Sequence, residues 1–189
     1  DERVVFDVLS DSTAEDYPDA IIVIADASSL ERNLLLFTEV RDLGIPTIMA
    51  LNMMDVAKKE NKSISIEALE KEFETIVVPI NARNRIGIEE LKLALTKEII
   101  APKNAFFDVK KLSPEIIPII KDKFNLGNEY LAYQYAQQTF SNPVLSIDEK
   151  RFIADVKVKY NFCDRQFQTQ ETVDRYQIIR EKLKRVVLN

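Results

Sequence analysis

Three short apolar runs in the first half of the chain alternate with amphipathic stretches. The runs are rich in β-branched residues and cover residues 20–25, 47–51 and 76–80. A continuous apolar run of this length is typical of a strand buried on both faces, as in a parallel sheet. Pro79 lies within the third run, which indicates a shortened or edge strand.

Helical spacing follows each of these runs. Apolar residues recur three or four positions apart at Leu30, Leu34, Phe37 and Val40, at Ile66, Leu69 and Phe73, and at Ile88, Leu91 and Leu95. We expect Ser28 or Ser29 to cap the first helix and Ser65 to cap the second, because serine accepts a hydrogen bond from the first helical turn. Gly44 should end the first helix, and Gly87 should open the third.

The second half of the chain has no strand-like run, and its apolar spacing is helical. We predict helices at about 114–124, 128–140, 147–160 and 166–187. Ser113 and Pro114 are expected to begin the first of these helices, and residues 101–111 to form a linker. Alternation of strands and helices implies right-handed crossovers. We therefore predict an α/β domain over residues 1–103 and a small all-α helical domain over residues 104–189.

The composition excludes several classes of protein. The chain has no histidine, and its single cysteine, Cys163, permits neither an intrachain disulfide nor a CxxC motif. The three glycines lie too far apart for a GxGxxG or GxxxxGK[ST] phosphate loop. A net charge of -5 argues against nucleic-acid binding. No apolar stretch approaches the ~20 residues of a membrane-spanning helix, and we assign no metal ligand and no catalytic residue.

The strongest local signal for chemistry follows the second apolar run, where Asn52 and Asp55 form an Asn-x-x-Asp pattern. Ligands of open α/β sheets bind beyond the carboxyl ends of the strands. There a carboxylate can accept both the ring N1–H and the exocyclic N2–H of guanine, while an amide meets the other edge of the base. The alternative is that Asn52 is a turn residue and Asp55 the N-cap of a short helix.

A second candidate element follows the third run, at Asn81, Ala82 and Arg83. Backbone N–H groups in this loop can donate to the guanine carbonyl, and the small side chain of Ala82 permits close approach. Alone, the segment is equally an ordinary strand-to-helix loop. Two such elements on consecutive strand ends of one sheet favour a site for a guanine base.

Residues 18–59 resemble the cytosolic G domain of FeoB, the prokaryotic ferrous iron transport protein B. The resemblance rests on the segments VIADA, LERNL, LGIP and ALNMMD. It implies a partial Ras-like parallel sheet with flanking helices, followed by the family's helical domain. The last predicted helix is similar to the end of that domain.

The resemblance also implies roles for the candidate site residues. Asn52 and Asp55 match the family's guanine-specificity motif, and Met53 stands where many GTPases have a lysine that packs along the base. Ala82 matches the family's Ser-Ala-(Lys/Arg) motif, in which Asn81 here replaces the serine. The implied ligand is GTP or GDP.

The FeoB resemblance further implies a phosphate loop, a switch I threonine and a DxPG motif. All are expected before residue 1, because residues 1–5 resemble the sequence just after DxPG. Mg²⁺ is expected only with that part. The intact protein is then a GTPase that regulates Fe²⁺ uptake, whereas these 189 residues alone should bind GTP poorly and not hydrolyse it.

The implied partners are the missing N-terminal segment of the G domain and the transmembrane region of the same protein. The implied location is the cytoplasmic side of the prokaryotic inner membrane. The strand at 20–25 would lack the neighbour it has in a Ras-like sheet, so we expect either that the missing N-terminal segment pairs with it or that the chain self-associates. The alternative is a non-enzymatic interaction module that retains a GTPase scaffold without a phosphate site. A remoter alternative is part of a translation-factor-like GTPase.

Several other residues have simpler interpretations. Asp26 is expected to cap a helix rather than to catalyse a reaction. The three tyrosines Tyr130, Tyr133 and Tyr135 are expected in a core or an interface. The basic residues Arg180, Lys182, Lys184 and Arg185 are expected on a solvated helix face, with a membrane-facing surface as the alternative.

Overall fold

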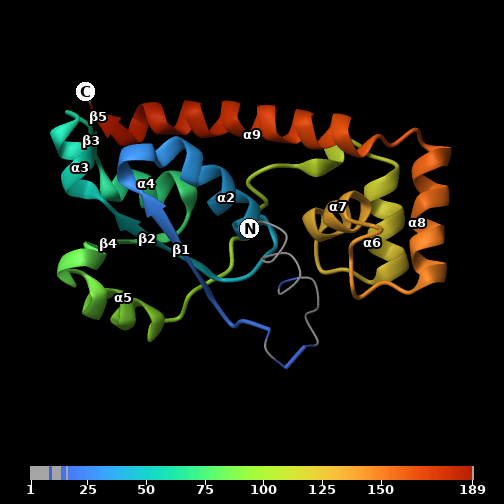
Figure 1. The fold of residues 1–189 in the computed structure, drawn as a ribbon, viewed down its shortest axis with the longest axis horizontal. Coiled ribbons are helices and arrows are strands. Elements are labelled where there is room, and N and C mark those ends of the chain that lie inside the picture. Colours follow the sequence, from blue (N-terminus) through green and yellow to red (C-terminus); the bar gives the residue numbers. More distant parts are fainter. Residues whose placement is uncertain (1–8, 10–13, 16, 189) are drawn as a thin grey trace. The chain divides into compact units, whose positions relative to one another are not determined.

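The chain folds into two compact units in the computed structural model, which describes residue 9, residues 14–15 and residues 17–188 (Figure 1). The sheet unit contains residues 19–106 and 174–189, and the helical unit contains residues 107–173 with the described residues before 19. Residues 1–5, which the sequence relates to the segment after a DxPG motif, lie outside the described residues.

The predicted domain division differs from these units at both ends of the chain, because the described residues before 19, which were predicted in the α/β domain, belong to the helical unit. The predicted boundary at 103/104 lies close to the first break between the units, which follows Phe106. Residues 174–189, however, join the sheet unit and not the helices. Side chains there pair with acidic residues of the sheet unit that lie more than 100 positions away in the sequence, which helical spacing alone cannot indicate.

The sheet unit is built on three parallel strands in the order β1-β2-β4. The predicted apolar runs form β1 (Ile21–Asp26), β2 (Thr47–Asn52) and β4 (Ile76–Pro79). Ile24 pairs in register with Ala50, which pairs with Val78 on its other side. The predicted α/β class, with a parallel sheet and flanking helices, is confirmed.

Helices cover both faces of this sheet (Figure 1). On one face α5 (Ile88–Leu95) packs Ala94 against Ile48, Ala50 and Val78. On the other face lie α2 (Leu30–Asp42) and α4 (Ile66–Phe73), and the rings of Phe37 and Phe73 meet edge to face with centroids 6.3 Å apart. A short helix, α3 (Met54–Lys59), follows β2 directly.

The expectation that β1 is buried on both faces is wrong. Val23 and Ala25 are buried, whereas Ile22 and Ile24 are 38% and 65% exposed. The exposed pair lies on the face that α5 covers over the other two strands, and β1 has only β2 beside it among the described strands. Only β2 is buried along nearly its whole length, as its central position requires.

The caps of the helices are partly those predicted. Ser65 caps α4 by accepting a hydrogen bond from the backbone N–H of Ala68 at 3.2 Å. Ser29 occupies the N-cap position of α2 but makes no side-chain cap bond. Asp26 instead accepts from the N–H and the hydroxyl of Ser28, at 2.8 and 2.7 Å, and caps the 3₁₀ turn η1 (Ala27–Ser29). These bonds, chiefly the hydroxyl bond, hold the pKa of Asp26 below its ordinary value.

The helical unit contains the helices that the spacing predicts. They are α6 (Ile116–Phe124), α7 (Glu129–Gln137), α8 (Ile147–Lys159) and the first part of α9 (Asp164–Val186), preceded by the 3₁₀ turn η3 (Val109–Lys111). The first of them begins at Ile116, with Glu115 rather than Ser113 as its N-cap.

Three neighbouring tyrosines of α7 belong to the core of the helical unit. Tyr130, Tyr133 and Tyr135 are all buried, as predicted. The rings of Tyr130 and Tyr133 stack with centroids 6.0 Å apart, and Tyr135 packs against Phe124 at 5.6 Å. The contact between Tyr135 and Phe124 stabilises the packing of α6 against α7.

A two-stranded antiparallel sheet joins the end of the chain to the sheet unit. β3 (Ser63–Ile64) pairs with β5 (Val187–Leu188), and the N–H of Ser65 donates to the carbonyl of Val186 at 2.9 Å. The sequence did not predict this pair, because strands of two residues show no periodicity.

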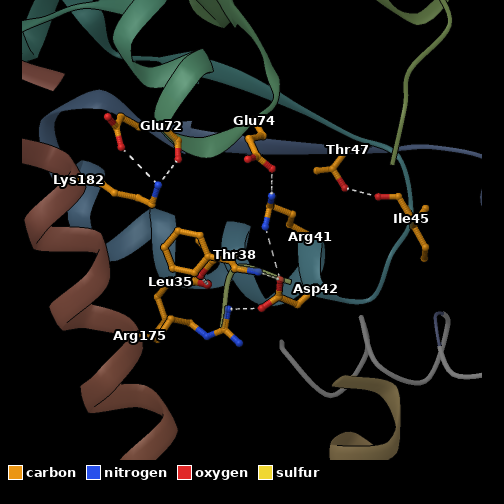
Figure 2. Close-up of polar contacts among 11 residues, drawn as sticks. Leu35, Thr38, Arg41, Asp42, Ile45, Thr47, Glu72, Glu74, Arg175 and Lys182 are labelled. Carbon is orange, nitrogen blue, oxygen red and sulfur yellow. Dashed lines mark hydrogen bonds and ion pairs between the residues drawn. The ribbon is translucent and has the colours of Figure 1, made fainter. Parts of the chain in front are cut away.

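Ion pairs hold the last part of α9 in the sheet unit. Arg185 binds both carboxylate oxygens of Glu72 at 2.6 and 2.8 Å, and Lys182 binds the Glu72 carbonyl at 2.6 Å (the Lys182 contacts are drawn in Figure 2). Arg180 binds Glu31 at 2.8 Å, and Lys184 binds Glu181 at 2.8 Å. All four basic residues of this helix end are therefore paired with acidic groups of the same unit.

Glu72 should make stability depend on pH in the acid range. Its hydrogen bond from Arg185, more than any other contact, lowers the pKa of Glu72 from 4.5 to about 2. Because the folded-state pKa lies below the unfolded one, this stabilisation is present above pH 4.5 and is lost as the pH falls toward 2. The difference in unfolding free energy between wild type and Glu72→Gln, measured in urea, should shrink over that range.

Glu67→Gln is the matched control for this prediction, since Glu67 is an exposed glutamate on the same helix. Its difference from wild type should stay small and nearly constant with pH. A Glu72→Gln difference that is also independent of pH would show that the ion pair adds nothing to folding.

Candidate functional site

The predicted site residues gather where two neighbouring parallel strands end. Asn52 is the last residue of β2, and Asp55 lies in the first turn of α3. Asn81 and Ala82 follow β4, where Ala82 begins the 3₁₀ turn η2 (Ala82–Asn84). Since β2 and β4 are parallel neighbours, both loops lie at the same edge of the sheet.

One hydrogen bond joins the two loops. The backbone N–H of Ala82 donates to the side-chain oxygen of Asn52 at 3.4 Å, across 30 positions of the sequence. The N–H of Ile80 donates to the carbonyl of Leu51 at 2.8 Å and extends the strand pairing up to this point. The Asn52 amide is therefore part of the sheet edge and not a turn residue.

Asn81 supports its own loop. Its side-chain oxygen accepts from the N–H of Asn84 at 3.1 Å, and its backbone N–H and carbonyl pair with Ile86 at 2.9 and 3.1 Å. This closes residues 81–86 into a compact turn whose open side carries the exposed Ala82 and Arg83. An asparagine at this position thus holds the loop by a bond that its amide oxygen provides.

Met53 has an unusual backbone conformation for a non-glycine residue. It is the N-cap of α3 with φ 64° and ψ 27°, in the left-handed region, and its side chain is 40% exposed. Such a conformation costs on the order of 1 kcal/mol or more and persists where the surrounding structure requires it. It leaves an apolar side chain at the surface between Asn52 and Asp55.

Asp55 lies in the first turn of α3 but has no capping role. The N-cap of α3 is Met53, so the interpretation of Asp55 as an N-cap is wrong. Its side chain is exposed, and within the part of the chain that the structure describes its carboxylate has no hydrogen-bond or ion-pair partner. The helix dipole favours a negative charge in this first turn. The carboxylate is free to accept hydrogen bonds from a ligand.

The arrangement at this edge is suited to binding and not to bond cleavage. It offers a carboxylate that can accept two hydrogen bonds, an apolar side chain that can cover a flat ring, and a loop in which the small Ala82 is exposed. Over residues 9, 14–15 and 17–188, no group of three or more histidine, cysteine, aspartate or glutamate side chains is placed to hold a metal ion.

Sequence reasoning missed two residues that support the site, Asn84 and Ile86. Both contribute through the backbone, so their side chains carry no signal. Asn81 itself was the available clue, because an asparagine side chain commonly accepts from an N–H a few residues further along in a turn.

The sheet unit also contains a cavity of about 580 Å³, which none of the candidate site residues line. Its lining comes from η1, the first turn of α2, β3 and the end of α9. Two of its three basic side chains are already bound, Arg180 to Glu31 at 2.8 Å and Lys62 to Glu60 at 2.7 Å. Its charges therefore serve mainly to join these elements.

The chain is similar to known proteins over its first half. A model of the family described as "Ferrous iron transport protein B" matches residues 1–95. Over 79 residues the chain is 47% identical to "Fe(2+) transporter FeoB" of Escherichia coli (strain K12) and 46% identical to the protein of that name from Salmonella typhimurium. Each match covers 42% of this chain and 10% of the relative.

Solved structures resemble the whole chain. The cytosolic domain of L. pneumophila FeoB superposes with a TM-score of 0.72 at 28% identity, over 100% of this chain and 74% of the other. The T. maritima cytosolic domain in its GMPPNP form gives 0.70 at 20% identity, with the same coverage. A GDP-bound S. thermophilus NFeoB mutant gives 0.65 at 22% identity, over 95% and 72%. At the two lower identities the likeness concerns the fold alone.

No helix within the described residues is long and apolar enough to cross a membrane.

Proposed function

Because the chain belongs to the ferrous iron transport protein B family, we propose that the edge formed by the ends of β2 and β4 binds the base of a guanine nucleotide. The observation that carries the proposal is the Asp55 carboxylate, which is exposed and without a partner among the described residues. A carboxylate held there can accept the N1–H and the exocyclic N2–H of guanine together. Adenine offers no such pair of donors, so the carboxylate selects guanine.

The other residues of the edge complete this proposed site. The Met53 side chain covers one face of the base, and Ala82 leaves room for the loop backbone to approach the base carbonyl. Asn52 fixes that loop through its bond to the N–H of Ala82 at 3.4 Å. Solved structures of the same fold hold GMPPNP or GDP, the ligand class proposed here.

The nucleotide would serve transport in the full-length protein. The curated relatives are Fe(2+) transporters, of which the matched stretch is a tenth. We infer that GTP binding and hydrolysis regulate Fe²⁺ uptake from the cytoplasmic side of the membrane, with the sheet unit as the part that recognises the base. Mg²⁺ would accompany the phosphate groups, and we assign no residue here to it.

Replacement of Asp55 by asparagine in the full-length protein tests the proposal. Two hydrogen bonds to a charged carboxylate contribute about 1.5–3 kcal/mol each, so GDP affinity should fall by at least ~10²-fold. Xanthosine diphosphate carries a carbonyl in place of the guanine amino group and should gain affinity. Titration calorimetry with GDP and xanthosine diphosphate measures both changes.

Asp148→Asn is the matched control, because Asp148 is an exposed aspartate in the first turn of α8 in the helical unit. It removes the same charge from an equivalent helix position and should leave both affinities unchanged. An Asp55→Asn protein that binds GDP as tightly as wild type would remove Asp55 from the site.

A further inference from the structure

The chain passes between its two units twice, after Phe106 and after Val173. On the side of the sheet unit, both passages lie beside one carboxylate. The backbone N–H of Phe106 donates to Oδ1 of Asp42 at 2.5 Å, and Nη1 of Arg175 donates to Oδ2 of Asp42 at 2.8 Å. Phe106 is the last residue before the first passage, and Arg175 is the second residue after the other. Figure 2 shows Asp42 between the side chains of Arg41 and Arg175.

Aromatic and cation–π contacts next to Asp42 hold the same two segments, the one that ends at Phe106 and the one that begins at residue 174. The Phe106 ring stacks on Phe73 with centroids 5.7 Å apart and an interplanar angle of 11°. The guanidinium of Arg175 lies 6.0 Å from the centroid of the Phe106 ring, and Nζ of Lys182 lies 5.8 Å from it. The segment before the first passage is thus fixed to α9 as well as to the end of α2.

A carboxylate is an unfavourable choice at this position unless it has a specific task. Asp42 is the last residue of α2, where the helix dipole disfavours negative charge. Its side chain and that of Arg175 are both 0% exposed, so both charges have lost their hydration. An apolar side chain could fill this space. The two carboxylate oxygens of Asp42 let it accept from a backbone N–H and from a guanidinium at once.

We propose that Asp42 is a positioning residue that ties both passages to one point of the sheet unit. The two segments that lead to residues 107–173 then share a single attachment, at the end of α2. Because both segments are bound to Asp42, a displacement of α2 would move both passages together. The start of α2 lies just beyond the end of β1. This positioning of the two segments does not depend on which ligand the sheet edge binds.

Distance measurements between spin labels test this in the 189-residue chain. Cys163 is the only cysteine of the sequence, is exposed, and lies in the helical unit. Glu90 is exposed on α5 in the sheet unit and accepts a second cysteine as Glu90→Cys. The Glu90→Cys protein, labelled at both cysteines, gives the reference width of the distance distribution by double electron–electron resonance. Asp42→Ala should broaden it, because both passages lose their common partner.

Glu31→Gln is the matched control, because it breaks the ion pair between Glu31 and Arg180 of α9 in the same unit, in the first turn of α2 and not at the end where Asp42 lies. It should leave the width of the distribution unchanged. An unchanged width in a folded Asp42→Ala protein, or equal broadening by Glu31→Gln, would overturn the proposal.

Hydrogen exchange in the unmodified protein gives a test that needs no variant to fold. The Phe106 amide should be protected to the same degree as amides within β2, because its N–H is bonded to a buried carboxylate. The amide of the exposed Asn104, two residues earlier, is the reference for a loop. Exchange of Phe106 as fast as that of Asn104 would show that the passage is not tied and would overturn the proposal.

Discussion

Gly87→Ala should destabilise the protein by about 3 kcal/mol or more, because two separate penalties meet at this residue. Gly87 has φ +80°, a conformation that is costly for any residue with a Cβ. A Cβ built there would also lie 2.2 Å from the carbonyl oxygen of Pro79 and 3.0 Å from Cα of Ile80. Both contacts are to backbone, which cannot rotate away.

The strain introduced by Gly87→Ala should weaken ligand binding at the candidate base site as well as lower the stability of the fold. Gly87 is the N-cap of α5 and directly follows the turn that Asn81 and Ile86 close. A shift of Pro79 and Ile80 would move the start of that turn and stretch the bond between Ala82 and Asn52. Weaker GDP binding by Gly87→Ala in the full-length protein is therefore expected together with the loss of stability.

Gly127→Ala is the control for Gly87→Ala, since a Cβ at Gly127 meets no atom within 4 Å. Chemical denaturation should show no loss for Gly127→Ala, and a small gain would agree with the reduced freedom of the unfolded chain. Equal stability of the two alanine variants would mean that the backbone around Gly87 adjusts without cost, contrary to this prediction.

The sheet and the position of the candidate site could be predicted from the sequence because both depend on local patterns. Each strand is an apolar run, and Asn52 and Asp55 follow the central one directly. Parallel pairing then requires the next strand's loop, with Ala82, to lie at the same edge. The family model agrees over residues 1–95, where these patterns are found.

The parts that escaped prediction depend on residues far apart in the sequence. The exposure of Ile22 and Ile24 depends on where α5 ends its cover of the sheet, which no property of β1 reveals. β3 and β5 pair across more than 100 positions with two residues each. The pairing of Arg175 with Asp42 spans 133 positions, and either residue alone fits the pattern of a solvated helix face.

Arg175→Met should cost about 3–5 kcal/mol of unfolding free energy, because it removes one partner of a buried ion pair. Nη1 of Arg175 lies 2.8 Å from Oδ2 of Asp42, and both side chains are 0% exposed. Methionine fills much of the same volume, so the loss comes mainly from a carboxylate left buried without its cation. Nη1 of Arg41 lies 3.6 Å from the other carboxylate oxygen, which places the expected loss toward the lower end of the range.

The unfolding free energies of three variants, measured in urea, separate the cost of an unpaired buried charge from the cost of lost packing. Lys184→Met breaks an exposed pair with Glu181 and should cost at most ~1 kcal/mol, since solvent screens such pairs. Asp42→Asn combined with Arg175→Met leaves no buried charge in this pair, and the side-chain amide oxygen introduced by Asp42→Asn can still accept from the Phe106 N–H. The double variant should therefore be more stable than Arg175→Met alone. If Arg175→Met costs no more than Lys184→Met, the Asp42 carboxylate does not need its partner in the folded state.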